Sequence, residues 1–92
     1  MIYYKKGDDK YMDSKVAVIG IIVENRESVP TLNRLLSDYG DYIIGRMGVP
    51  YHKRGISVIS VAIDAPQDII NSLSESIASL DGVHAETAYS GM

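Results

Sequence analysis

Two segments that are apolar at almost every position constrain the fold of this chain most. They are VAVIGIIVE, residues 16–24, and ISVISVAID, residues 56–64. β-branched residues are frequent in both, which favours strands, and a strand without polar alternation is covered on both of its faces. We therefore expect both segments to lie in the middle of a sheet.

The first predicted helix lies between these two strands. Ser28 is a candidate N-cap residue, Pro30 falls in the first turn, where its missing N–H costs nothing, and Gly40 follows the last turn. The apolar residues between them recur at helical spacing and form one stripe, which consists of Val29, Leu32, Leu35, Leu36 and Tyr39.

The second predicted helix follows residues 56–64. Asp64 and Gln67 have the spacing of a capping box, Pro66 lies between them, and residues 81–82 mark the end of the helix. Its apolar stripe consists of Ile69, Ile70, Leu73, Ile77 and Leu80. Each helix thus has one face that must pack against another element.

Two further strands complete the pattern. Residues 42–51 contain Pro50, which cannot donate to a ladder, so this strand belongs at an edge of the sheet. Residues 52–55 have the length and final glycine of a hairpin turn. Residues 83–90 alternate in polarity, so one face of that strand should be wet.

The order of the predicted elements is β-α-β-β-α-β, the ferredoxin-like plan of an α+β protein. This plan implies a four-stranded antiparallel sheet with both helices on one face. We expect one domain over residues 15–90. The preceding residues 1–14 have six charged side chains and no sustained periodicity, so we interpret them as an N-terminal extension.

Composition excludes several classes of function. The formal net charge is −3, which disfavours direct binding to nucleic acid, and no apolar run approaches the length of a membrane span. There is no cysteine and no secretion signal, so we expect a cytoplasmic protein. Neither His52 nor His84 has a catalytic or metal-ligand context, so we expect no catalytic residues, no cofactor and no metal site.

Two helices cannot cover both faces of the predicted sheet. If Ile59, Val61 and Ile63 face the helices, apolar residues of both central strands remain on the other face. In the first strand this set is either Val16, Val18 and Ile22 or Ala17, Ile19, Ile21 and Val23. Leaving this apolar surface in water would forgo free energy comparable with the whole stability of a small domain. We therefore expect copies of the chain to associate through this face, as a dimer or tetramer. A tolerated, mildly apolar surface is the alternative.

Candidate ligand-binding residues gather on the predicted hairpin. Arg46, His52, Lys53 and Arg54 are potentially cationic, so a small anionic ligand or an acidic protein partner could dock there. Tyr51 could add stacking or a hydroxyl contact, and His52 a pH-sensitive donor. A solvated hairpin tip is the alternative interpretation.

Two other positions are weaker candidates. Asn25 and Arg26 lie in the loop before the first helix, whose N-terminus can bind an anion unless Ser28 already caps it. Gly45 and Gly48 leave part of the edge strand without side chains, which either admits a ligand or another backbone, or marks a bulge.

Residues 16–90 resemble the family of iron-only hydrogenase system regulators. The resemblance is carried by DYGDYIIGRMGVPY at residues 38–51, RGISVISV at residues 54–61, the DAP that begins the second helix, and the terminal TAYS. It implies an ACT-like ferredoxin fold, similar to the C-terminal, nickel-sensing domain of the nickel-responsive repressor, which forms tetramers. It also implies a regulatory or ligand-sensing function.

The chain departs from the ligand sites of these relatives. In an ungapped comparison with the repressor, the places of two metal-binding histidines fall on Gly48 and Pro50, and that of a cysteine falls on Ile56. Nickel sensing is therefore not expected. Amino-acid-binding ACT domains have a glycine in the loop where this chain has residues 25–27, so amino-acid binding is not expected either.

The resemblance and the residues together predict a small homo-oligomeric regulatory module that senses a ligand. The repressor's DNA-reading segment precedes its sensor domain, and the 14 residues available here lack its pattern. We therefore expect no DNA-binding segment in this chain. The alternative is a protein–protein scaffold or regulatory subunit without a small ligand.

Overall fold

The computed structural model describes residues 13–91. Its strands and helices follow the predicted order, with two short 3₁₀ helices between them. The elements are β1 (Ser14–Val23), η2 (Arg26–Ser28), α1 (Val29–Asp38), η3 (Gly40–Tyr42), β2 (Ile43–Tyr51), β3 (Ile56–Pro66), α2 (Gln67–Ala78) and β4 (Val83–Tyr89). The predicted extension, residues 1–14, lies outside the described residues except for Asp13 and Ser14.

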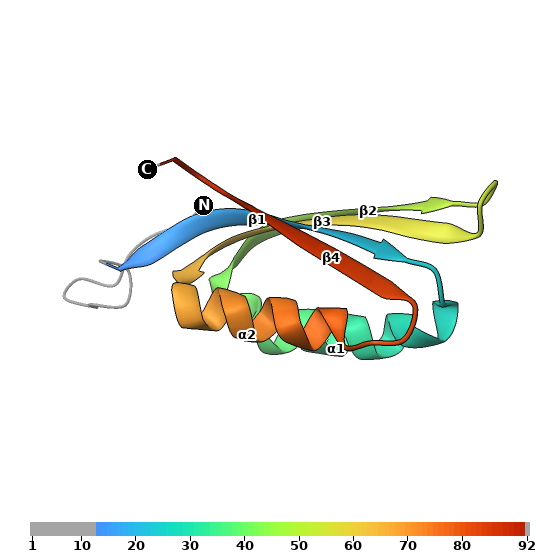
Figure 1. Ribbon diagram of the computed structural model, residues 1–92, viewed down its shortest axis with the longest axis horizontal. Coiled ribbons are helices and arrows are strands. Elements are labelled where there is room, and N and C mark those ends of the chain that lie inside the picture. The colour runs from blue at the N-terminus through green and yellow to red at the C-terminus, as the bar shows by residue number, and fades with distance from the viewer. Residues whose placement is uncertain (1–12, 92) are drawn as a thin grey trace.

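The four strands form one antiparallel sheet in the order β2-β3-β1-β4. The two most apolar strands, β1 and β3, are therefore central, as their lack of polar alternation predicts. Both helices lie on one face of this sheet, and no other described element covers the opposite face (Figure 1). This arrangement confirms the ferredoxin-like fold.

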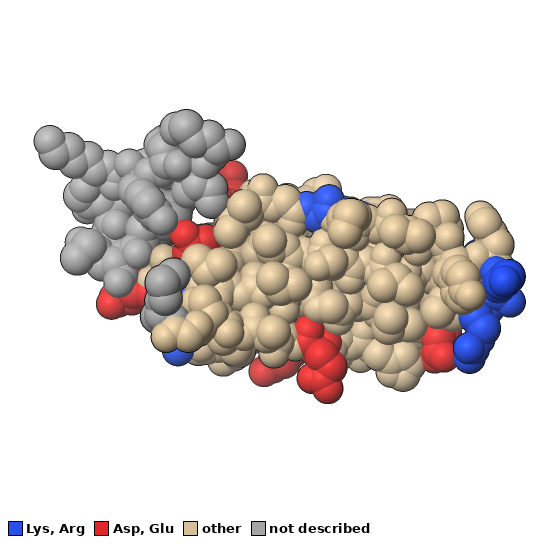
Figure 2. Space-filling model, turned by 90° about the horizontal axis from the view of Figure 1, so that it is seen from above, with Lys and Arg blue, Asp and Glu red and all other residues tan. Residues whose placement is uncertain are grey.

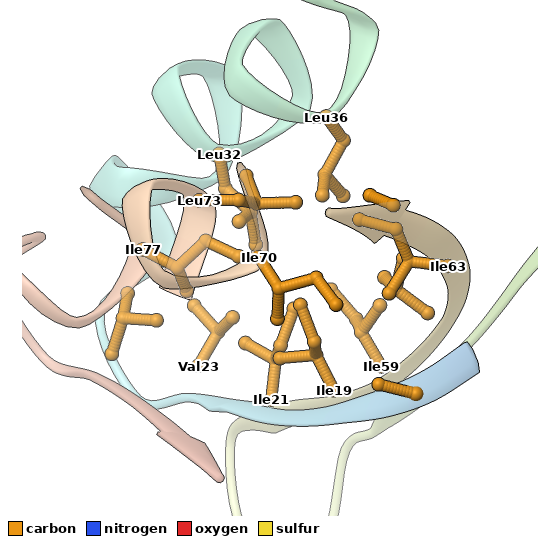
Figure 3. Close-up of a cluster of buried hydrophobic side chains, with 14 residues drawn as sticks. Ile19, Ile21, Val23, Leu32, Leu36, Ile59, Ile63, Ile70, Leu73 and Ile77 are labelled. Carbon is orange, nitrogen blue, oxygen red and sulfur yellow. The ribbon is translucent and has the colours of Figure 1, made fainter. Parts of the chain in front are cut away.

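The core lies between the sheet and the two helices. Alternate residues of β1 and β3 point toward Leu32 and Leu36 of α1 and toward Ile70, Leu73 and Ile77 of α2 (Figure 3). The buried residues of the two central strands are Ala17, Ile19, Ile21, Val23, Ile59, Val61, Ile63 and Ala65. The other members of the predicted helical stripes, Val29, Leu35, Tyr39, Ile69 and Leu80, pack against this cluster. Both stripes are confirmed.

The predicted side-chain cap of the first helix is wrong. Ser28 precedes α1, but its hydroxyl donates to the carbonyl oxygen of Asp81 at 2.6 Å and makes no capping bond. The helical turn begins earlier, at η2, where Oδ1 of Asn25 accepts from the N–H of Glu27 at 3.0 Å. A contact with the distant loop after α2 thus replaces the local cap.

The predicted capping box of the second helix is also wrong. Asp64 stays in β3 and is only 5% exposed, because β3 continues to Pro66 in register with the first residues of β1. Pro66 occupies the N-cap position of α2, and no side chain caps that helix. Pairing with β1 thus prevails over the local signal.

β2 has the features of an edge strand, as predicted from Pro50. Its pairing with β3 shifts register between Ile43 and Gly45, which favours the bulge interpretation of that glycine. The predicted hairpin turn is confirmed. In this turn the N–H groups of Arg54 and Gly55 donate to the carbonyl oxygens of Tyr51 and His52, each at 3.2 Å.

No helix in the described part of the chain has the length and apolar character to cross a membrane.

Candidate functional site

The uncovered face of the sheet, called the open face below, is apolar. It carries seven of the nine large hydrophobic side chains that are exposed in the described chain, and their exposed fractions run from 36% to 67%. They are Val16, Val18, Ile22, Met47, Val49, Tyr51 and Val58. The sequence left two possible sets for β1, and the structure exposes Val16, Val18 and Ile22 while it buries the other set.

Charged side chains lie around the open face and not on its middle. Seen from above, the centre is uncharged, and most of the Lys and Arg side chains in view gather at one end (Figure 2). Asp and Glu side chains lie along the rim, together with single Lys or Arg side chains. Gly20 and Ser60, which are paired across β1 and β3, leave the centre without large side chains. Such a surface is well suited to contact another uncharged surface.

The cationic end of this view is the tip of the β2–β3 hairpin, which extends beyond the helices (Figure 1). His52, Lys53 and Arg54 are all exposed there. Tyr51 is 45% exposed and pairs with Ile56 at the base of the turn. The structure thus brings together three of the predicted ligand residues, Tyr51, His52 and Arg54.

Arg46 lies apart from this group. It belongs to the side of β2 that faces the helices, where its Nη2 donates to Oδ1 of Asn33 in α1 at 3.0 Å. Because a strand rises about 3.3 Å per residue, Arg46 is about 17 Å from Tyr51, where the turn begins. Within one chain, Arg46 and Arg54 therefore cannot hold the same small anion.

The two loop candidates differ from each other. Asn25 is engaged in the fold, because its Oδ1 caps η2 and its Nδ2 donates to Oδ2 of Asp81 at 2.7 Å. Arg26 is exposed and lies beyond the same end of the sheet as the hairpin, since Val23 at the end of β1 pairs with Ser57. The sequence indicated a cap in this region but assigned it to Ser28.

His84 and Glu24 form a contact that is not among the interactions predicted from the sequence. Their Nε2 and Oε1 atoms are 2.7 Å apart, and both side chains are more than half exposed. No local motif signals this pair, because only the pairing of β1 with β4 brings the two residues together. Within residues 13–91, no three His, Asp or Glu side chains are grouped as a metal site would require.

The helical side of the molecule has a shallow hollow of about 460 Å³. It is lined by five residues of α2 and by the residue that follows this helix, namely Asp68, Asn71, Ser72, Glu75, Ser76 and Ser79. Two of these are carboxylates and none is cationic, so this hollow is unsuited to an anion. The hairpin tip is the better candidate for the predicted ligand.

Comparison with protein families gives a match that covers most of the chain. Residues 15–87 match the model of the TM1266-like family, described as iron-only hydrogenase system regulator. None of the curated proteins compared with the chain matches it.

Solved structures show a similar fold. The uncharacterized protein TM1266 from Thermotoga maritima is 22% identical, with a TM-score of 0.79, over 83% of this chain and 96% of that chain. A formyltetrahydrofolate deformylase from Pseudomonas putida KT2440 is 15% identical, with a TM-score of 0.58, over 79% of this chain and 28% of that chain.

A third structure comes from a regulatory protein. The nitrogen regulatory PII-like protein from Thiomonas intermedia K12, bound to ADP, AMP and bicarbonate, is 17% identical, with a TM-score of 0.50, over 85% of this chain and 92% of that chain. At these identities the likeness concerns the fold and not the ligands.

Proposed function

The chain belongs to the TM1266-like family of iron-only hydrogenase system regulators, and from this premise we propose that it is a cytoplasmic regulatory module without catalytic activity. It associates with a second copy through the open face and presents the hairpin tip to a small anionic ligand. It reaches its regulatory target through another protein chain and makes no direct contact with nucleic acid. The observation that carries this proposal is the uncharged open face with cations at one end (Figure 2).

The size of the open face supports association with a second copy. Four strands about 4.8 Å apart, with about eight residues each at 3.3 Å per residue, present roughly 500 Å². Two copies would then bury about 1,000 Å², the lower range of specific protein interfaces. A second copy of the chain carries the same uncharged face and is present wherever the protein is made. When two such faces meet, no charge has to be removed from water at the centre of the contact.

The hairpin tip supports binding of an anion. Lys53 and Arg54 are exposed, and no described carboxylate forms an ion pair with either of them. An arginine at such a position can bind phosphate or carboxylate oxygens through two parallel hydrogen bonds. Tyr51 stands at the junction of the tip and the open face, so a bound ligand would lie close to the proposed interface.

The association is tested by a charge on the open face. We expect Val18→Glu to shift the protein in sedimentation equilibrium toward assemblies of half the mass, with the dissociation constant of the open-face contact weakened at least about tenfold by the buried charge. The matched control is Thr31→Glu, which adds the same charge to an exposed position of α1. A wild-type protein that sediments as a monomer at micromolar concentration would refute this part of the proposal.

The ligand site is tested by comparing two arginines of the same hairpin. With inorganic phosphate as the probe, we expect Arg54→Ala to weaken binding at least about fivefold in a calorimetric titration, because a charge-assisted bond is lost. Arg46→Ala should change binding little, since this side chain lies on the other side of β2. Equal effects of the two substitutions, or no phosphate binding at all, would contradict the assignment of the tip.

Native mass spectrometry distinguishes a sensor from a scaffold. The protein is purified from the cells that produce it, and its complexes are weighed without denaturation. A retained small anion supports the sensing module. A retained foreign protein chain without any small mass supports instead the alternative function of a scaffold or regulatory subunit.

A further inference from the structure

The two edges of the sheet differ in how they are protected. The edge at β2 has a register shift between Ile43 and Gly45 and contains Pro50, and such features keep an edge from pairing with another strand. β4 has neither a proline nor a shift, and it pairs with β1 without interruption from Val83 to Tyr89. No other strand within residues 13–91 lies beside it.

The backbone of β4 can accept a further strand. The N–H of Ser90 donates to the carbonyl oxygen of Val16 at 2.9 Å, and the N–H of Glu24 donates to that of Gly82 at 2.7 Å. In an antiparallel ladder, hydrogen-bonded pairs alternate along the strand, so the even-numbered residues of β4 bond to β1. The odd-numbered residues, including Ala85 and Thr87, therefore direct their N–H and C=O groups outward.

We propose that β4 pairs with β4 of a second copy in antiparallel orientation, so that two four-stranded sheets continue into one sheet. The contact lies at the edge and leaves the open face free. It therefore goes beyond the proposed function, because it adds a second interface that does not depend on the first. If both interfaces form, the assembly is a tetramer.

The charges of β4 select the register of this pairing. With the two-fold axis at Ala85, His84 lies opposite the partner's Glu86, and the same pair occurs twice. With the axis at Glu86, two carboxylates would lie directly opposite each other, which is unfavourable. Nε2 of His84 already contacts Glu24, so Nδ1 is the atom that can reach the partner's Glu86.

The helix beside β4 leaves room for a second copy. The stripe of α2 along this edge is uncharged, and two of its residues bond to β4. Gln67 Nε2 donates to Tyr89 Oη at 2.6 Å, and Ser74 Oγ lies 3.2 Å from Thr87 Oγ1. Asn71 and Ala78 continue the stripe at helical spacing. Because the stripe is uncharged and its Ser74 and Ala78 are small, two α2 helices can approach to about 8–10 Å between their axes, the usual distance for packed helices.

Single-cysteine variants test the pairing and its register, because the chain has no cysteine of its own. The variants A85C, E86C and T87C are oxidised in parallel, and the disulfide-linked dimers are quantified by non-reducing electrophoresis. We expect A85C to give the most dimer, since residues facing each other at the axis have Cα atoms about 5.5 Å apart, within disulfide range. Absence of dimer for A85C, or more dimer for E86C or T87C, would overturn the proposal.

Two substitutions in the A85C protein test whether backbone hydrogen bonds and charges hold the two β4 strands together. Thr87→Pro removes an outward N–H that β1 does not use, so it should abolish the cross-link while circular dichroism shows an intact fold. Glu86→Lys should reduce the cross-linked fraction about fivefold, because it replaces the carboxylate opposite His84 with an ammonium group that cannot accept a hydrogen bond. The control Glu27→Lys makes the same change in η2, away from this edge. If Glu86→Lys and Glu27→Lys behave alike, the proposed register is wrong.

The proposed edge contact and the proposed open-face contact can be tested independently of each other. In the A85C protein, Val18→Glu should leave the cross-link unchanged, because Val18 points to the open face. A cross-link that Val18→Glu abolishes would show that the edges do not pair on their own. A cross-link that persists while Val18→Glu leaves sedimentation unchanged would instead refute the open-face association alone.

Discussion

Neighbouring residues of β1 can be alike in chemistry and differ in burial, because they lie on opposite sides of the sheet. In β1, Ile21 is 1% exposed and faces the helices, whereas the next residue, Ile22, is 36% exposed on the open face. We call the covered face with its helices the packed side, and the open face with the β2–β3 hairpin the open side. One half of the apolar residues of β1 therefore stabilises the fold, while the other half stays partly exposed in the described chain.

The largest expected contrast comes from two neighbouring isoleucines. Ile21→Ala should lower the free energy of unfolding by about 2–5 kcal/mol, because it leaves a cavity in the core. Ile22→Ala should cost less than about 1 kcal/mol in the monomer, since its side chain is partly in water already. Urea unfolding of both variants under monomeric conditions measures the difference. Similar losses for the two would show that the open face is covered in the folded monomer.

A second contrast uses two glycines with nearly the same backbone conformation, Gly82 at φ 67° and Gly55 at φ 66°. A Cβ atom on Gly82 would lie 2.7 Å from Cβ of Asn25, whereas one on Gly55 would have no neighbour within 4 Å. Both alanine variants bear the strain of left-handed backbone, about 1–2 kcal/mol. Gly82→Ala should lose roughly 1–2 kcal/mol more through the overlap.

Thermal unfolding of the two glycine variants measures this additional loss. If Gly55→Ala were as destabilised as Gly82→Ala, the hairpin turn would be as tightly packed as the loop after α2. The packed and open sides would then not differ at their turns.

A third contrast lies in the loop before α1. Asn25→Ala removes the cap of η2 and the bond to Asp81, so it should cost about 1 kcal/mol. Arg26→Ala should change the stability by less than about 0.5 kcal/mol, because its side chain is exposed. Chemical denaturation of both variants gives the values. A loss for Arg26→Ala equal to that for Asn25→Ala would contradict the purely structural assignment of the cap.

The smallest expected contrast compares two tyrosine hydroxyls. Tyr39→Phe removes a hydrogen bond of 2.9 Å between Oη of Tyr39 and Oγ of Ser72, and it should cost about 0.5 kcal/mol. Tyr51→Phe, on the open side, should leave the stability unchanged and affect only phosphate binding. Paired melting curves and phosphate titrations distinguish the two effects. A stability loss for Tyr51→Phe would show that its hydroxyl supports the hairpin itself.

Most of the fold could be predicted because it follows from periodic burial. The stripes of α1 and α2 and the absence of alternation in β1 and β3 depend on residues close together in the chain. The helix caps could not be predicted. Ser28 bonds to Asp81 and Asp64 stays in β3, and both outcomes depend on partners about fifty residues away. Local capping signals are weak enough that such contacts override them.

The candidate site was predictable only in part. The composition of the hairpin tip follows directly from residues 51–54, and the turn keeps Tyr51, His52 and Arg54 together. Arg46 was grouped with them because it belongs to the same hairpin. Its side chain points to the other side of β2, and the bulge beside Gly45 makes this direction hard to infer by counting alternate residues.

The amino-acid sequence alone was enough to predict the number and order of the strands and α-helices, since hydrophobic spacing decides which segments become strands and which become helices. It also determined that two helices could not cover both faces of the sheet. The set of β1 residues that remains exposed could be read only from the fold, because the register of β1 with β3 sets the direction of every side chain at once. Only the structure showed that β4 pairs with β1 without interruption and has no strand of residues 13–91 on its other side, since the protection of an edge depends on its neighbours in the sheet.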